Sequence, residues 1–90
     1  MLIKTKCKTY VFYSDPGHGW LAVKKDELVK LNIINDVSGY SYMKGKTVYL
    51  EEDCDAPLFI KKMEELNKPF NYRECFRERT NIRNYPPFRK

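Results

Sequence analysis

The sequence predicts a small α+β domain, with a mainly antiparallel sheet of about five strands and two helices against one face of the sheet. Ninety residues are enough for a single domain with a modest hydrophobic core. Short segments rich in β-branched and aromatic residues lie at both ends and in the middle of the chain. Two segments with apolar residues at helical spacing separate them, which gives the order β-β-α-β-β-α-β.

The domain is expected to comprise residues 1–80, followed by an extended basic tail over residues 81–90. The tail contains Pro86-Pro87, which disfavours a helix and favours an extended backbone. Hydrophobic residues make up 42% of the chain and charged residues 32%, so the composition is typical of a globular protein and not of a disordered one.

The first strand is predicted over residues 3–14, where polar and apolar residues alternate early and apolar residues occupy both faces later. A dense turn signal, DPGHG, follows over residues 15–19. Residues 20–23, WLAV, then predict a second strand that runs antiparallel to the first. The two strands together indicate one edge-to-edge pair near the N-terminus.

A first helix is predicted over residues 25–31, and Asp26 is its expected N-terminal cap. Leu28 and Leu31 are spaced to face the core, since residues three apart share one side of a helix. Gly39 is expected to end this segment, because glycine commonly follows the end of a helical region.

The stretch from Tyr40 to Asp55 predicts a β-hairpin that leads into an acidic helix start. Gly45 lies between its two strand segments and can adopt a positive φ without steric cost, so a tight turn is expected there. Val48 and Leu50 would then share one side of the sheet, because side chains alternate along a strand.

The second helix is predicted over residues 56–67, with Pro57 in its first turn. Asp53 or Asp55 is its expected cap, since negative charge near a helix N-terminus is stabilising. A metal site or a general-base cluster is the weaker interpretation of these carboxylates. The predicted apolar face consists of Leu58, Phe59, Met63 and Leu66, with Ile60 at its edge.

Residues 70–79, FNYRECFRER, predict the last strand. One face carries an arginine stripe that continues into the tail: Arg73, Arg77, Arg79 and Arg83. Guanidinium groups bind phosphate with two parallel hydrogen bonds and stack on bases, so this stripe is the strongest indication of function in the sequence. The alternative is a solvated strand face that pairs with acidic residues of the same chain.

The net charge of +5 is unevenly distributed. Residues 1–25 carry five lysines and one aspartate, a net +4. Residues 26–67 carry five lysines and nine acidic residues, a net −4, and residues 68–90 carry seven basic and two acidic residues, a net +5. An acidic middle between two basic ends favours a charged partner surface.

The sequence contains no run of 18 apolar residues, so no membrane span is predicted. The N-terminus lacks the long apolar segment of a signal peptide. We therefore expect a cytoplasmic protein. Cys7, Cys54 and Cys75 are odd in number and widely spaced. This spacing argues against a disulfide framework and against a zinc site, and favours buried free thiols.

His18 is the single histidine, and it lies in the predicted turn between the first two strands. A chemical role would pair it with Asp15, Cys54 or Asp55, as a metal site or a Cys/His nucleophile. We favour a local hydrogen-bonding role, because a lone histidine without a spaced partner is weak evidence. The sequence therefore predicts no catalytic residue, no metal site and no cofactor.

Three segments, FYSDPGHGWLAV, SGYSYMKGKTVYLEEDCDA and RTNIRNY, resemble a set of small, mostly uncharacterised proteins encoded by bacteriophages and prophages. The similarity covers about residues 10–85, and the first two segments are its most specific part. The resemblance implies a setting, a phage-infected bacterial cell, and it implies no catalytic residue.

From that setting we expect a non-enzymatic accessory protein that inhibits a host defence system, in the manner of anti-CRISPR proteins, by binding a defence protein complex or its phosphorylated nucleotide ligand. The candidate binding residues are the arginine stripe, aromatic residues and the first turn: Arg73, Arg77, Arg79, Arg83, Tyr85, Tyr42, Tyr49, His18 and Trp20. Direct nucleic-acid binding by the basic strand and tail is the alternative. A small hydrolase or metal-dependent enzyme centred on His18 ranks below it. An edge strand and many aromatic residues are also compatible with a homodimer.

Overall fold

The computed structural model describes residues 8–89 and confirms the predicted α+β class. The part of the predicted first strand before Lys8, and Cys7 with it, lies outside the described residues. The strands and α-helices follow the predicted order, and two short 3-10 helices are added. The elements are β1 (Lys8–Ser14), β2 (Gly19–Lys24), α1 (Lys25–Lys30), η1 (Ile34–Asp36), β3 (Tyr42–Lys44), β4 (Thr47–Glu51), α2 (Ala56–Glu65), β5 (Phe70–Phe76) and η2 (Asn81–Asn84).

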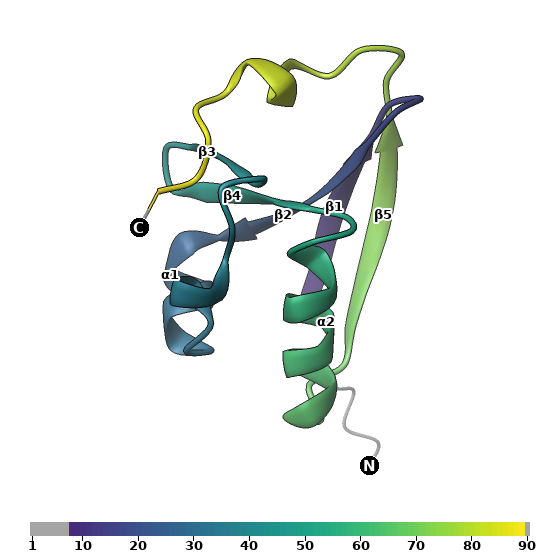
Figure 1. The fold of residues 1–90 in the computed structure, drawn as a ribbon. Helices are drawn as coiled ribbons and strands as arrows, with labels where there is room; N and C mark the ends of the chain where they lie inside the picture. Colours follow the sequence, from purple (N-terminus) through teal and green to yellow (C-terminus); the bar gives the residue numbers. More distant parts are fainter. Residues whose placement is uncertain (1–7, 90) are drawn as a thin grey trace.

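The five strands form one sheet in the order β3-β4-β2-β1-β5 (Figure 1). Three of the four strand pairs are antiparallel, including β1 with β2, as predicted. The fourth pair, β1 with β5, is parallel, with Lys8 opposite Phe70 and Ser14 opposite Phe76. Helix α2 carries the chain back along the sheet before β5 begins, so β5 starts at the same end as β1 (Figure 1).

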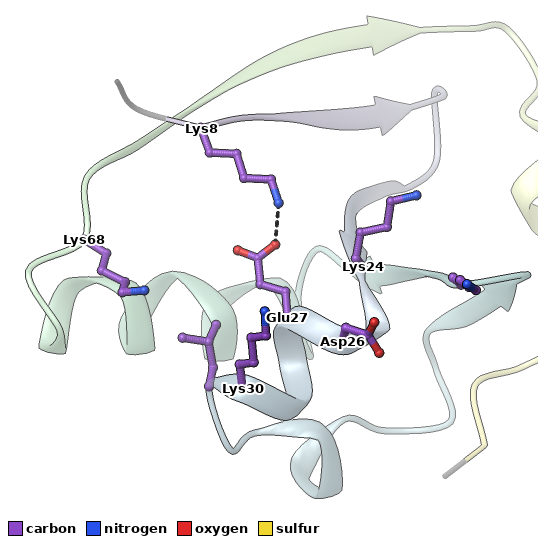
Figure 2. Close-up of a pocket in the computed structure, with 8 residues that line it drawn as sticks. Lys8, Lys24, Asp26, Glu27, Lys30 and Lys68 are labelled. Carbon is purple, nitrogen blue, oxygen red and sulfur yellow. Dashed lines mark hydrogen bonds and ion pairs between the residues drawn. The ribbon is translucent and has the colours of Figure 1, made fainter. Parts of the chain in front are cut away.

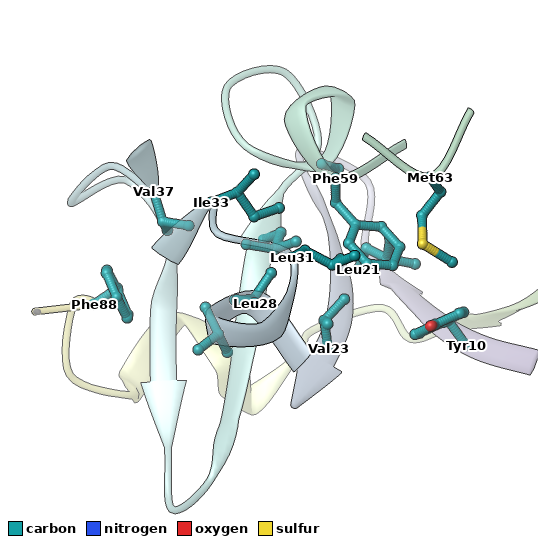
Figure 3. Packing of buried hydrophobic residues seen from close by; sticks show 13 residues of the cluster. Tyr10, Leu21, Val23, Leu28, Leu31, Ile33, Val37, Phe59, Met63 and Phe88 are labelled. Carbon is teal, nitrogen blue, oxygen red and sulfur yellow. The ribbon is translucent and has the colours of Figure 1, made fainter. Parts of the chain in front are cut away.

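Both helices pack on the same face of the sheet, as predicted, and the main core lies between them and the strands (Figure 3). Leu28 of α1 and Phe59 of α2 are fully buried there, together with Val48 and Leu50 of β4. Complete burial of one such side chain contributes about 1.5–3 kcal/mol to folding. The ring of Tyr10 contacts that of Phe59 edge-on, with centres 5.1 Å apart, and so joins α2 to β1.

The hairpin forms where it was predicted, between β3 and β4. Gly45 has a φ of +61°, in the left-handed region that glycine adopts at little cost. Val48 and Leu50 point into the core, so the predicted phase of β4 is confirmed. This phase leaves Tyr49 on the other face of the sheet.

The predicted N-terminal cap is wrong for α1, and for α2 it is confirmed in position but not in its hydrogen bond. Helix α1 follows β2 directly, so Lys24 occupies the N-cap position and Asp26 lies inside the first turn. Asp55 does occupy the N-cap position of α2, but its carboxylate makes no capping hydrogen bond. It accepts hydrogen bonds from Ser38 and Ser41 instead, which ties α2 to the segment before β3. Pro57 lies in the first turn, as predicted.

The apolar face of α2 is narrower than predicted. Phe59 and Met63, one turn apart, are buried. Leu58 is only half-buried, whereas Ile60 is 37% exposed and Leu66 47% exposed. Helix α2 ends at Glu65, so Leu66 already lies beyond it, and a single strip of α2 faces the sheet.

Residues 81–89 differ from the extended tail that Pro86-Pro87 predicts. Asn81–Asn84 forms the 3-10 helix η2, and the chain then crosses to β3 (Figure 1). Phe88 N–H donates to the carbonyl of Ser41 at 2.7 Å, and the Phe88 side chain is buried in the main core. The free energy gained by burying apolar residues of this segment exceeds the conformational entropy that the segment loses. Its backbone also covers the β3 edge of the sheet.

Candidate functional site

The face of the sheet opposite the helices carries a row of aromatic side chains. Tyr13 on β1 lies opposite Trp20 on β2, and Tyr42 on β3 lies opposite Tyr49 on β4. Because side chains alternate along a strand, these residues point away from the main core. The C-terminal segment passes over this face, where it buries Ile82 outside the main core.

Tyr13, Tyr49 and Tyr85 form a cluster on this face. The ring centre of Tyr49 lies 6.0 Å from that of Tyr13 and 5.3 Å from that of Tyr85. Burial raises the pKa of Tyr49, and the neighbouring phenols of Tyr85 and Tyr13 raise it further. The Tyr49 phenol is protonated at neutral pH, as an ordinary tyrosine is, and can donate a hydrogen bond to an anion.

Arg77 and Arg79 stand beside the tyrosine cluster. Strand β5 ends at Phe76, so both arginines lie in the loop that follows it and not on the strand as predicted. Arg77 N–H donates to the carbonyl of Ser14 at 2.9 Å, which fixes the start of this loop to β1. Both side chains are exposed, and no ion pair holds either of them within residues 8–89.

Together these residues enclose a hollow of about 390 Å³, which we call the tyrosine-arginine hollow. Its wall combines phenol rings, two guanidinium groups and the hydroxyl and amide of neighbouring residues. The lining residues are Tyr13, Tyr49, Arg77, Arg79, Thr80, Asn81, Ile82 and Tyr85. The arrangement suits a ligand that has both an anionic group and a flat apolar part.

Arg83 lies apart from this hollow and is held by Asp15. Its Nε and Nη2 donate to the two Asp15 carboxylate oxygens at 2.8 and 2.7 Å. The Arg83 hydrogen bonds hold the pKa of Asp15 well below its usual range, and the N–H groups of Gly17 and His18 act in the same direction. The guanidinium of Arg83 is thus committed to a structural ion pair, which also raises the pKa of Arg83.

His18 and Trp20 belong to the same cluster as Arg83. The His18 ring stacks on that of Trp20, with ring centres 5.9 Å apart. The Nδ1 atom of His18 lies 3.0 Å from Arg83 Nη2. The guanidinium carbon of Arg83 lies 5.5 Å from the Trp20 ring centre. Such a contact stabilises a cation over an indole face, so Arg83 joins the first turn to the C-terminal segment.

A second hollow, of about 330 Å³, lies beside this cluster. It brings together His18 and Cys54, which the sequence offered as a Cys/His pair. A hydrogen bond to Glu51 raises the pKa of Cys54, and burial and nearby carboxylates raise it further, so the reactive thiolate is disfavoured. Cys54 is also exposed, contrary to the prediction of a buried thiol, and Cys75 is only half-buried. No group of three metal-ligating side chains occurs within residues 8–89.

The nine predicted binding residues therefore fall into three places. Four line the tyrosine-arginine hollow: Arg77, Arg79, Tyr49 and Tyr85. Four line the second hollow: His18, Trp20, Tyr42 and Arg83. Arg73 lies exposed on the edge strand β5, outside both hollows. The arginine stripe is divided because β5 ends at Phe76, whereas the alternation of residues in the sequence continues to Arg79.

Two groups of residues escaped the sequence prediction. The first is Tyr13, which completes the tyrosine cluster. Its alternation with Phe12 along β1 could have placed it on the face opposite the core. Five lysines line a further hollow beside α1 (Figure 2), although they come from four separate segments of the chain. Charge counted along the sequence shows no such cluster, because it forms only when the strands pair.

Comparisons of the chain with protein-family models, with curated proteins and with solved structures give no match. Within residues 8–89, neither α1 nor α2 approaches the length of about 20 apolar residues that a membrane-spanning helix requires.

Proposed function

We propose that this chain is a non-enzymatic binding protein that takes a nucleotide, a phosphorylated ligand with an aromatic base, into the tyrosine-arginine hollow. One observation carries the proposal: Arg77 and Arg79, which lack ion-pair partners among the described residues, stand beside three clustered tyrosines. A guanidinium group binds a phosphate through two parallel hydrogen bonds. Stacking of a base on an aromatic ring contributes about 1–3 kcal/mol to binding. The hollow offers both contacts at once.

The resemblance to bacteriophage and prophage proteins supplies the setting of the proposal. In an infected bacterial cell, a small protein that holds a nucleotide signal withholds it from the host defence system that responds to it. A defence protein complex that presents such a nucleotide is the corresponding protein target. A binding role is supported further by the raised pKa of Cys54, which disfavours the thiolate that a Cys/His nucleophile requires.

The test is calorimetric titration of the purified chain with adenosine 5′-monophosphate, guanosine 5′-monophosphate, adenosine and inorganic phosphate. We expect the two nucleotides to bind more tightly than either fragment. The double variant Arg77→Ala/Arg79→Ala should lose at least about 2 kcal/mol of binding free energy, roughly 30-fold in Kd. Arg73→Ala is the matched control, because Arg73 is an exposed arginine outside the hollow.

The control separates site binding from general charge. A loss of binding free energy in Arg73→Ala that reaches half of the loss in the double variant would reject the hollow as the site, since each removed charge would then count equally wherever it lies. Failure of both nucleotides to bind the unaltered chain would reject a nucleotide as the ligand.

For the protein target, the tagged chain is used to capture partners from a host lysate after nuclease treatment. A complex retained by the unaltered chain and lost from the double variant supports the defence-complex form of the proposal.

A second candidate function is binding of single-stranded nucleic acid along β5. The observation in its favour is the exposure of Tyr72 (63%) and Phe76 (58%) on the same edge strand as Arg73. Exposed rings provide stacking, and Arg73, on the other face of the same edge strand, provides positive charge. This function predicts that affinity for a labelled oligonucleotide falls with salt, by roughly 0.7 log units per phosphate contact for each log unit of salt. Loss of affinity in Tyr72→Ala, with Arg77→Ala/Arg79→Ala unaffected, would favour it over the nucleotide hollow.

A further inference from the structure

Five lysines meet at one end of the sheet, around α1 (Figure 2). They enclose a hollow of about 440 Å³, which we call the lysine hollow. All five are exposed, and Asp26, Glu27 and Leu31 complete the lining. The lysines are Lys8 in β1, Lys24 at the end of β2, Lys30 in α1, Lys46 in the β3–β4 turn and Lys68 between α2 and β5.

The topology of the sheet explains why these residues converge. Strand β1 begins at the end of the sheet where β2 finishes, because the two are antiparallel. The β3–β4 turn lies at the same end, since Lys24 is opposite Thr47 and the N–H of Lys25 donates to the carbonyl of Lys46 at 2.8 Å. The parallel pairing of β5 with β1 brings Lys68 to this end as well. The convergence is thus a property of the fold and not of one flexible loop.

Glu27 lies among the lysines (Figure 2), and its carboxylate is already engaged. Lys8 Nζ lies 2.8 Å from Glu27 Oε1, and the hydroxyl of Tyr10 donates to the other oxygen. Lys24 Nζ donates a hydrogen bond to the hydroxyl of Thr47 at 3.4 Å. Within residues 8–89, Lys30, Lys46 and Lys68 have no ion-pair partner, so the lining carries five positive charges against two negative ones.

We propose that the lysine hollow binds a compact polyphosphate group, as found in inorganic oligophosphates and in nucleoside triphosphates. A concave wall with a net charge of +3 fits an anion whose charge is concentrated in a small volume. Among the residues that the structure describes, no aromatic side chain lines this hollow, so they offer no stacking surface for a base. Lysine ammonium groups act as mobile point charges, which suits a chain of phosphates without a fixed geometry.

This site is separate from the tyrosine-arginine hollow. The tyrosines lie on the second face of the sheet, whereas α1 lies on the core face. Lys8 is the first residue of β1, and Tyr13 lies near the end of that strand. The two proposals therefore depend on different residues, and variants can test them independently.

The experiment is calorimetric titration with inorganic tripolyphosphate, with adenosine 5′-triphosphate and with inorganic monophosphate, at low and moderate salt. We expect tripolyphosphate to bind at least about tenfold more tightly than monophosphate. Lys30→Ala/Lys68→Ala should weaken tripolyphosphate binding by at least about tenfold, and Arg77→Ala/Arg79→Ala should leave it unchanged. Lys61→Ala is the matched control, because Lys61 is an exposed lysine of α2 outside the hollow.

Glu27→Gln provides a second variant with the opposite effect. Gln keeps a side-chain oxygen that can accept the hydrogen bond from Tyr10, and it removes a negative charge from the hollow. Binding of tripolyphosphate should become tighter, which loss of folding in a variant cannot imitate. Circular dichroism of each variant verifies that the fold is retained.

The outcomes decide the proposal. A loss of binding free energy in Lys61→Ala that reaches half of the loss in the lysine double variant would overturn it, since each removed charge would then count equally wherever it lies. Unchanged or weaker binding in Glu27→Gln would also overturn it. If the lysine double variant weakens both polyphosphates equally, the phosphate chain itself is the recognised group. If it weakens adenosine triphosphate alone, recognition of a bare polyphosphate is rejected.

Discussion

Arg83 and Asp15 form an ion pair with two hydrogen bonds although they lie 68 positions apart in the sequence. The Asp15 side chain is only 2% exposed because the Arg83 side chain, which is 40% exposed, covers it. The pair fastens the C-terminal segment to the turn between β1 and β2. Because Tyr85 follows Arg83 by two residues, the same ion pair positions one wall of the tyrosine-arginine hollow.

The Asp15–Arg83 pair predicts a stability that falls with acidification. The pKa of Asp15 is lower in the folded chain than in the unfolded chain, where it is about 3.9. Its stabilising contribution is therefore complete above about pH 4 and is lost progressively as the pH falls below that value. Urea unfolding of the unaltered chain and of Asp15→Asn, between about pH 2 and pH 7, measures the difference.

In Asp15→Asn the free energy of unfolding should be lower at pH 7 and should decline less on acidification. Asp36→Asn is the control, because Asp36 is exposed and has no ion pair among the described residues. Parallel pH profiles for the unaltered chain and Asp15→Asn would contradict the assignment.

Phe88 is expected to be a major stabilising residue although it lies near the end of the chain. Its side chain is 4% exposed within the main core. Replacing a buried phenylalanine with alanine removes apolar burial and leaves a cavity, which costs about 3–5 kcal/mol. Chemical denaturation of Phe88→Ala should show this loss, whereas Phe76→Ala, at a 58% exposed position, should lose less than about 1 kcal/mol. Similar losses in the two variants would show that the C-terminal segment is not packed as described.

Ser41 should be a small residue with a large effect on stability. Its hydroxyl donates to the buried carboxylate of Asp55 and accepts the N–H of Glu51 at 3.0 Å. Ser41→Ala leaves both groups short of a partner, which should cost about 1–3 kcal/mol in urea unfolding. In an Asp55→Ala background the same substitution should cost clearly less, since one unsatisfied group is already absent. Additive losses in this double-mutant cycle would count against the hydrogen bond.

Gly45 should resist substitution by alanine more than Gly39 does. Gly45 has a φ of +61°, where a β-carbon is strained, so Gly45→Ala should lose about 1 kcal/mol of stability. Gly39 has no positive φ and open space around it, so Gly39→Ala should be neutral or slightly stabilising. Gly45→Asn should recover part of the loss, because asparagine tolerates the left-handed region. Thermal unfolding of the three variants tests this order.

Much of the fold follows from local patterns in the sequence. The hairpin around Gly45, the inward phase of Val48 and Leu50, and the position of Pro57 in α2 were all predicted and are confirmed. Each depends on residues within a few positions of one another, through alternation, helical spacing or a backbone preference. The predicted cap failed at Asp26 because α1 follows the preceding strand directly. Asp55 holds the predicted N-cap position of α2, but its carboxylate bonds to two distant serines and not to the helix.

The candidate sites follow from the sequence only in part. An arginine-rich and tyrosine-rich chain was evident, but the division of Arg77 and Arg79 from Arg83 was not. Asp15 and Arg83 are paired because the C-terminal segment returns to the first turn. The lysines around Glu27 are gathered because β1, β2 and β5 place their ends together.

The sequence by itself thus determined the order of the elements and part of the core, since the spacing of apolar side chains decides which face each element buries. Only the tertiary structure decided which charges are paired and which are free. Ion pairs and hollows form between segments that are tens of residues apart, and no short-range pattern specifies which strand lies beside which. The strand order β3-β4-β2-β1-β5 therefore creates the two anion-binding candidates from residues that are ordinary in sequence.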